Sequence, residues 1–205
     1  MAFRRVVLRI VLPISCAAVA AAAPRAGATL PDPRFNTIDA VVVGNTTGTA
    51  MGGAPAGFDV TMRDINNAPR ANVIVTLDFS ATVIRLYSTQ NAGTTLNCAA
   101  RTLSRTTDAL GRVNFGTRLG GYSNSSLVQV IGDGEPLGVV MGRSTDLDGV
   151  DGKTGLGDLA LFTANLLSNA AAQETDFDLN GTTGLGDLSL FATELLSHAS
   201  GTYCP

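Results

Sequence analysis

The sequence predicts a chain of two parts: an all-β region arranged as a two-sheet sandwich, followed by a small α-helical region. Residues 36–143 contain short segments that alternate apolar and polar side chains and are rich in Val, Ile, Thr and Phe. Gly-, Asn- and Pro-containing turns separate these segments at regular spacing. After Ser144 the pattern changes, because a loop followed by a helix-like segment occurs twice.

Seven segments of the first part are predicted to be strands. None shows the 3.6-residue period of a helix, and seven short strands in one region favour two packed sheets. The predicted strands are residues 37–43, 58–63, 72–79, 83–87, 112–115, 127–131 and 137–141.

The composition excludes several functional classes. The 205 residues are 45% hydrophobic and 15% charged, which indicates a folded chain. There is no Trp, and the one histidine, His198, has no nucleophile pattern around it, so a His-based triad or three-His metal site cannot be assembled. The formal charge of −3 does not favour a nucleic-acid partner. We therefore expect a protein that is not an enzyme.

Residues 1–28 are typical of a secretory signal peptide. Three arginines precede an uncharged apolar run at residues 10–23, and a small-x-small motif ends at Ala28. The run is shorter than the roughly 20 residues that span a bilayer. A permanent N-terminal anchor and lipidation at Cys16 are the alternatives. No other segment has the character of a membrane span, so we expect a secreted, extracellular or cell-surface protein.

The β region also resembles a known family. The segments FDVTMRDINNAPRANVIVTLDFS (58–80) and TTDALGRVNF (106–115) are similar to bacterial Ig-like domains of surface and secreted proteins. Asp108 and Gly111 suit the turn that precedes the second strand, because Asp bonds its own backbone and Gly tolerates positive φ. The resemblance implies an Ig-like sandwich over residues 36–143; a β-sandwich of other ancestry is the alternative.

The second part contains an internal repeat. The segments DLDGVDGKTGLGDLALFTANLLS, from Asp146, and DFDLNGTTGLGDLSLFATELLS, from Asp176, share Thr-Gly-Leu-Gly-Asp-Leu at 154–159 and 183–188. Such agreement indicates duplication. Residues 144–205 carry nine acids and one base, Lys153, so the repeat is expected to need a cation or a basic partner.

The second copy has the spacing of a twelve-residue Ca²⁺ loop. Oxygen-bearing side chains stand at positions 1, 3, 5 and 12, Gly181 stands at position 6, and Thr182 at position 7 would supply a backbone carbonyl. Oxygen donors without His or Cys favour Ca²⁺ over zinc or copper. The side-chain candidates are Asp176, Asp178, Asn180 and Asp187.

The first copy is predicted to form a second Ca²⁺ site with a less certain register. One extra residue lies near Val150, so either Asp146 or Asp148 is the candidate for a displaced ligand. A duplicated Asp/Gly-rich turn without metal is the alternative interpretation. The candidate site residues are Asp146, Asp148, Asp151, Lys153 and Asp158.

A helix with one apolar stripe is predicted after each loop. Neither helix can bury its stripe alone, so we expect the two to pack face to face and form a small core. The stripes are Leu159, Phe162 and Leu166 in the first helix and Leu188, Phe191 and Leu195 in the second.

This duplicated loop–helix unit resembles the dockerin domain over residues 146–196. The resemblance implies two F-hand Ca²⁺ sites, antiparallel helices and docking onto cohesin modules. The family commonly docks through a Ser-Thr pair at loop positions 10 and 11 and basic residues on the helix. Here Leu156-Gly157 and Leu185-Gly186 replace that pair, and the helices carry no Lys or Arg. The dockerin-like unit is assigned to residues 144–199, with a tail at 200–205.

Two cysteines, Cys98 and Cys204, remain after removal of the signal peptide. An even pair in an oxidising compartment predicts a disulfide that ties the tail to the β region. Pairing with another chain is the alternative.

Together these features predict a secreted, non-catalytic structural or interaction protein with an Ig-like domain and a Ca²⁺-folded dockerin-like module. The alternative is a dockerin-bearing component of an extracellular, cohesin-based assembly that degrades polysaccharides. A cohesin-like protein partner is expected for the C-terminal module, and neither nucleic acid nor a membrane span is expected.

Overall fold

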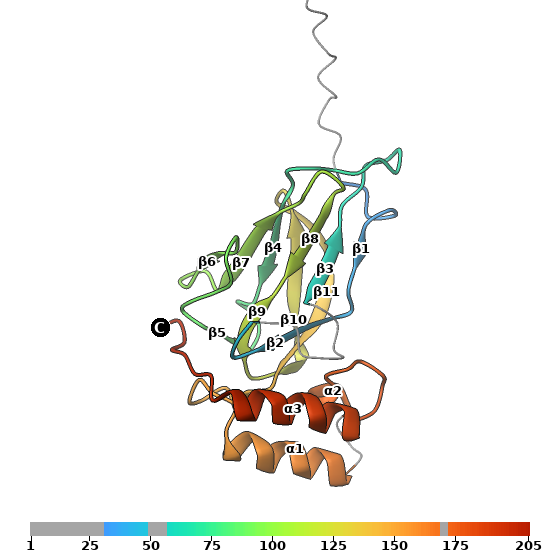
Figure 1. The fold of residues 1–205 in the computed structure, drawn as a ribbon. Coiled ribbons are helices and arrows are strands. Elements are labelled where there is room, and N and C mark those ends of the chain that lie inside the picture. The colour runs from blue at the N-terminus through green and yellow to red at the C-terminus, as the bar shows by residue number, and fades with distance from the viewer. Residues whose placement is uncertain (1–30, 49–56, 169–171) are drawn as a thin grey trace, which may run out of the picture.

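The computed structural model describes residues 31–48, 57–168 and 172–205, with strands in one part of the chain and helices at its C-terminal end (Figure 1). The predicted signal peptide at 1–28 lies outside the described residues. Among the helices within these ranges, none has the length and apolar character needed to span a membrane.

The strands of the described residues form two sheets. One sheet has three strands in the order β1-β3-β8, and the other has eight in the order β5-β9-β2-β11-β10-β4-β7-β6. The strands are β1 (Thr37–Ile38), β2 (Val41–Asn45), β3 (Phe58–Thr61), β4 (Ile74–Asp78), β5 (Arg85–Leu86), β6 (Thr95–Asn97), β7 (Thr102–Thr106), β8 (Arg112–Phe115), β9 (Thr117–Gly120), β10 (Ser123–Gly132) and β11 (Glu135–Ser144).

A shared hydrophobic core lies between the two sheets. Phe58 and Val60 from β3 and Phe115 from β8 pack in one cluster with Leu77 from β4 and Val130 from β10, and all five are fully buried. This alternation of buried and exposed residues is the pattern that predicts strands with one face on a core. The predicted all-β region with two packed sheets is confirmed.

The first predicted strand, residues 37–43, is divided in the structure. β1 pairs antiparallel with β3 in the small sheet, whereas β2 pairs in parallel with β11 and β9 in the large sheet. A strand that moves between sheets must bend, and the bend falls at residues 39–40. Apolar periodicity continues through such a bend, so the sequence pattern did not show it.

Three strands were not predicted, and two were predicted too short. β6, β7 and β9 are rich in polar residues; β7, for example, buries Leu103 while its other residues are partly or largely exposed. The segments at 127–131 and 137–141 extend into the long hairpin of β10 and β11. Its two-residue turn, Asp133-Gly134, has positive φ at both positions, as tight hairpin turns require.

In the described part of the chain three helices follow the sheets: α1 (Leu156–Ser168), α2 (Ala172–Thr175) and α3 (Leu185–Ser197). α1 and α3 run antiparallel at one end of the β region (Figure 1). The rings of Phe162 and Phe191 are fully buried and stack with their centroids 5.1 Å apart. The remaining stripe residues are partly buried against this cluster: Leu159, Leu166, Leu188 and Leu195. The two apolar stripes are therefore core, as predicted.

This second core is not formed by the helices alone, and here the sequence-based expectation was incomplete. Val41 and Val43 of β2 are buried in the cluster of Phe162, Phe177 and Phe191, whereas Val42 between them is buried in the sandwich core. Because successive strand residues point to opposite faces, β2 contributes to both cores. The triple valine therefore joins the sheet to the helices.

Buried polar contacts also fix the helical unit on the sheet. The carboxylate Oε1 of Glu194 in α3 accepts hydrogen bonds from the Thr46 hydroxyl at 2.7 Å and the Thr47 N–H at 3.1 Å. The buried guanidinium of Arg143 in β11 donates to the Asp176 carbonyl and lies 3.8 Å from its carboxylate Oδ2. Charged groups are seldom buried without such partners. These contacts therefore help to fix the position of the helical unit on the sheet.

The C-terminal tail returns to the β region. Cys98 and Cys204 are joined by a disulfide, and the Cys204 N–H donates to the Leu86 carbonyl at 2.8 Å. We expect a thiol assay on the denatured, unreduced protein to detect no free thiol. Two titratable thiols per chain would contradict the pairing, and a disulfide-linked dimer on a non-reducing gel would indicate the alternative.

Candidate metal centre

The second acidic loop lies between α2 and α3 and brings three carboxylates together. Asp176, Asp178 and Asp187 each offer one carboxylate oxygen, and these oxygens lie within 4.8 Å of one another. Asp187 is the third residue of α3, where its Oδ2 accepts the Gly184 N–H at 2.8 Å. Carboxylates favour this helix position because the first N–H groups lack helical partners. The start of the helix thus places the candidate ligand at loop position 12.

The backbone of this loop is shaped around Asp176. Its Oδ1 accepts the Asn180 N–H and its Oδ2 accepts the Gly181 N–H, both at 3.0 Å. Gly181 has a φ of +91°, which side chains disfavour, so glycine suits position 6. Asn180 donates from Nδ2 to Asp178 Oδ2 at 2.9 Å, and its Oδ1 accepts the Thr182 N–H at 2.9 Å. Asn180 therefore lies beside the carboxylates, and Thr182 lies next to it.

The first loop gathers four carboxylates from Asp146, Asp148, Asp151 and Asp158, again with one oxygen of each within 4.8 Å of the others. Asp146 and Asp148, the two candidates for a ligand displaced by the extra residue, both lie within this group. Asp158 is the third residue of α1, and its Oδ2 accepts the Gly155 N–H at 2.7 Å, which repeats the arrangement at Asp187.

Lys153 differs in character from the other candidates of the first loop. Its ammonium lies 3.4 Å from Asp151 Oδ2, in a pair in which both side chains are about half exposed. A positively charged side chain cannot ligate a cation, so only its backbone carbonyl is a candidate donor. Exposed ion pairs of this kind are weak, and Asp151 therefore remains accessible to a metal.

Burial and crowding disfavour the negative charge of these carboxylates in the absence of a cation. The pKa of Asp146 is raised to about 7, chiefly by burial and also by the charges of Asp158 and Asp148, although hydrogen bonds from two tyrosine hydroxyls oppose the shift. Burial also raises the pKa of Asp158 and of Asp176 above the ordinary value. A divalent cation would remove this penalty, because opposite charge favours the ionised form.

The donor chemistry fits a hard cation. The grouped side chains offer carboxylate oxygens from seven aspartates, and neither group contains a His or a Cys. Hard oxygen donors select Ca²⁺ or Mg²⁺ over zinc and copper. Ca²⁺ tolerates irregular shells of six to eight oxygens, whereas Mg²⁺ demands near-octahedral geometry. Two Asp-rich loops of different length are therefore better suited to Ca²⁺.

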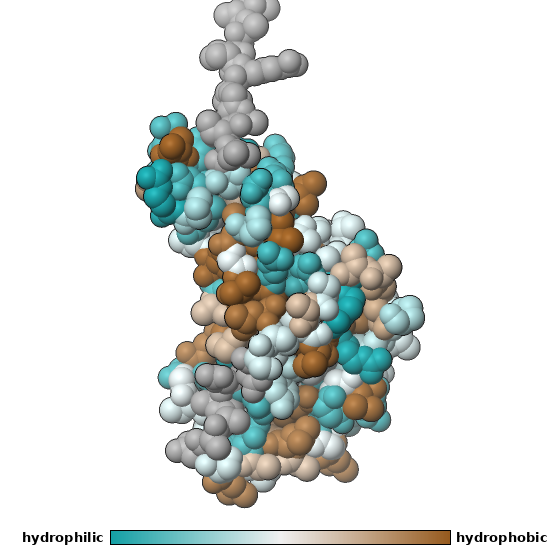
Figure 2. All heavy atoms as spheres, turned by 180° about the vertical axis from the view of Figure 1, so that it is seen from behind, coloured by the Kyte–Doolittle hydropathy of each residue, from teal (hydrophilic) through white to brown (hydrophobic). Residues whose placement is uncertain are grey.

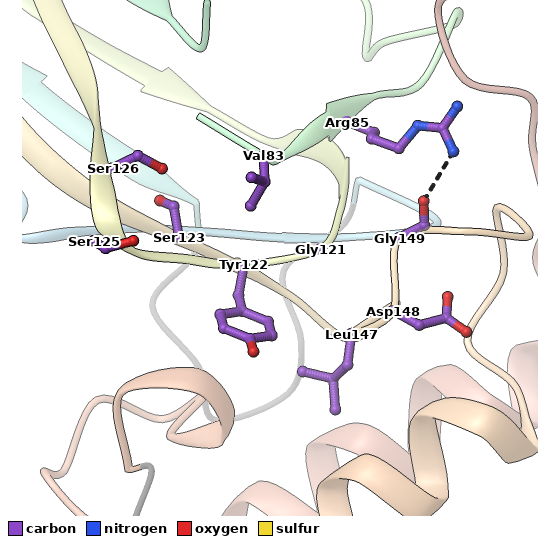
Figure 3. Close-up of a pocket in the computed structure, with 10 residues that line it drawn as sticks. All are labelled: Val83, Arg85, Gly121, Tyr122, Ser123, Ser125, Ser126, Leu147, Asp148 and Gly149. Carbon is purple, nitrogen blue, oxygen red and sulfur yellow. Dashed lines mark hydrogen bonds between the residues drawn. The ribbon is translucent and has the colours of Figure 1, made fainter. Parts of the chain in front are cut away.

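The loops are also contacted by residues outside them, which the sequence analysis did not identify. Figure 3 shows a pocket beside the first loop, where Arg85 of β5 reaches the Gly149 carbonyl, with Nη1 to O at 3.1 Å. In the same view the side chains of Tyr122 and Leu147 point toward the helices. Tyr87, Arg143 and Tyr203 contact loop aspartates as well. Tyr87 and Tyr203 lie 59 and 57 residues from Asp146, and Arg143 lies 33 residues before Asp176. A tyrosine beside a paired cysteine was the one available signal.

Comparisons of the chain with protein-family models, with curated proteins and with solved structures found no match. The Ig-like and dockerin-like interpretations therefore depend on the sequence motifs and on the arrangement described above.

Proposed function

We propose that the chain is a secreted, non-catalytic structural or interaction protein whose dockerin-like C-terminal module binds two Ca²⁺ ions. The observation that carries the proposal is the gathering of seven aspartates into two groups at the starts of α1 and α3. The two groups occupy equivalent places in a duplicated unit. Duplication alone would copy a cluster of acids, but four of the seven aspartates are buried, where an uncompensated carboxylate is costly: Asp146, Asp158, Asp176 and Asp187.

The position of the two groups suggests what the ions do. Asp158 and Asp187 each stand in the first turn of a helix, and the cores of both helices depend on Phe162 and Phe191 packed against β2. Metal binding that orders the loops also orders the helix starts, and its binding free energy becomes folding free energy. At millimolar extracellular Ca²⁺, even a site with a Kd of about 10⁻⁴ M is filled.

Calorimetric Ca²⁺ titration of two matched variants tests the proposal. The wild-type protein should bind two ions per chain, whereas Asp151→Asn and Asp178→Asn should each lose or strongly weaken one of them. Both side chains are grouped with the other carboxylates, and neither caps a helix. Glu135→Gln, which removes the same charge from an exposed position on β11, is the control and should bind two ions. Absence of binding to the wild type would contradict the proposal.

The alternative function, docking onto a cohesin in a polysaccharide-degrading assembly, has one observation in its favour. Leu156 and Leu185 occupy equivalent positions of the two copies and are 78% and 81% exposed. Apolar side chains are visible at the helical end of the molecule also from behind (Figure 2). Binding of the protein to a member of a purified cohesin panel, with loss of that binding in Leu156→Asp/Leu185→Asp, would support this function. Absence of binding to every cohesin in the panel would contradict it.

A further inference from the structure

Asp146 and Asp176 hold position 1 of the two loops, but different groups orient them. Asp176 is held by two N–H groups of its own loop and by Arg143. Asp146 accepts one N–H from its loop, that of Gly149 at 3.0 Å on Oδ1. Its Oδ2 accepts the hydroxyls of Tyr87, at 3.0 Å, and of Tyr203. The longer first loop thus relies on donors from outside itself.

The two tyrosines come from separate parts of the chain. Tyr87 follows β5 at the sheet edge and is fully buried, whereas Tyr203 lies in the C-terminal tail. Their rings are in contact, with centroids 4.8 Å apart, and the Arg85 guanidinium lies 4.5 Å from the centre of the Tyr203 ring. Gly120 leaves room for the Tyr203 hydroxyl, since a Cβ there would overlap it.

The tail that carries Tyr203 is attached on both sides of it. The disulfide of Cys204 lies on one side, and on the other Thr202 accepts the Ser88 N–H at 2.8 Å. The Gly201 N–H also donates to the Gly152 carbonyl of the first loop at 2.9 Å. The tail therefore lies against the first loop and keeps the Tyr203 hydroxyl on Asp146.

Building on the Ca²⁺ sites proposed above, we propose that Tyr203 is a positioning residue for the first site and that the disulfide keeps it in place. Fixing one oxygen of a carboxylate fixes the direction of the other, and groups that orient metal ligands typically account for about 10–100-fold in metal affinity. The first site is then completed by the tail, whereas the second site is completed by its own loop and by Arg143 of β11.

The test is Ca²⁺ titration of the full protein in the Asp178→Asn background, in which the first site remains. Tyr203→Phe keeps the ring contacts and removes the hydroxyl; it should weaken the first site about 10–100-fold. Cys98→Ser/Cys204→Ser should weaken it in the same direction. Thr202→Ala is the control, because its exposed hydroxyl bonds Ser88 and does not contact Asp146, and it should leave the affinity unchanged.

A parallel titration in the Asp151→Asn background reports the second site, which Tyr203→Phe should not alter. Unchanged first-site affinity in Tyr203→Phe would overturn the proposal. Equal weakening of both sites, with a lower melting temperature in chelator, would also overturn it by showing a general structural role. Unchanged affinity without the disulfide would overturn the role assigned to Cys98–Cys204. Failure of the wild type to bind Ca²⁺ is a separate outcome and contradicts the proposed function instead.

Discussion

Removal of Ca²⁺ by EDTA is expected to unfold much of the helical unit while most of the β structure remains. Without cations, four carboxylates in one loop and three in the other repel one another within 4.8 Å. The starts of α1 and α3 would lose their fixed geometry, because Asp158 and Asp187 belong to these groups. The sandwich core contains no candidate ligand, and it is therefore expected to persist.

The magnitude follows from binding linkage. At free Ca²⁺ about 100 times the Kd, each site stabilises the folded state by about 2.7 kcal/mol, which is a large fraction of the roughly 5–15 kcal/mol stability of a typical domain. For a unit of this size each kcal/mol shifts the melting temperature by about 4–8 °C. Chelation should therefore lower the melting temperature of the helical unit by more than about 10 °C.

Circular dichroism at 222 nm, followed during heating with Ca²⁺ or with EDTA, measures this effect. Mg²⁺ in place of Ca²⁺ is the ionic-strength control and should restore little of the transition. Asp151→Asn/Asp178→Asn should resemble the chelated wild type even in Ca²⁺. A helical signal and melting temperature that do not change on chelation would contradict a Ca²⁺-dependent fold.

The parts of the fold that local sequence patterns determine were predicted well. β8 begins and ends where alternation placed it, at residues 112–115, and the stripe phenylalanines of both helices are buried. Periodicity indicates which face of an element is buried. This local signal was enough to place β8 and to identify the buried phenylalanines. The grouping of the loop aspartates followed from spacing for the same reason, since the whole loop is one short segment.

The parts that depend on distant contacts were not predictable from the sequence. Nothing in the local pattern of Val41–Val43 shows that alternate valines enter different cores, because that depends on which element covers each face of β2. Arg143 lies two residues beyond the predicted strand at 137–141, and nothing near it in the sequence indicates that it is buried beside Asp176. Tyr87 and Tyr203 lie 59 and 57 residues from Asp146. Such contacts are fixed by topology, which sequence spacing does not encode.

The shared core leads to a second large effect: Phe191→Ala should destabilise the protein by about 3–5 kcal/mol. Phe191 is fully buried, stacks on Phe162 and lies in the cluster that includes Val41 and Val43. Truncation leaves a cavity between α3 and the sheet, and the close-packed surroundings can relax only in part. Because helix packing is linked through folding to the proposed metal binding, the variant should also bind Ca²⁺ more weakly.

Denaturant unfolding at fixed free Ca²⁺, combined with Ca²⁺ titration, separates this prediction from a local effect. Leu196→Ala is the matched control: it lies in the same helix, loses a similar apolar side chain and is 72% exposed, so it should change stability by less than about 0.5 kcal/mol. If α3 were an independent attachment, Phe191→Ala would leave the transition of the β region at its wild-type position. Because β2 lines both cores, we instead expect the midpoint of the β transition to move to lower denaturant in Phe191→Ala and to stay in place in Leu196→Ala.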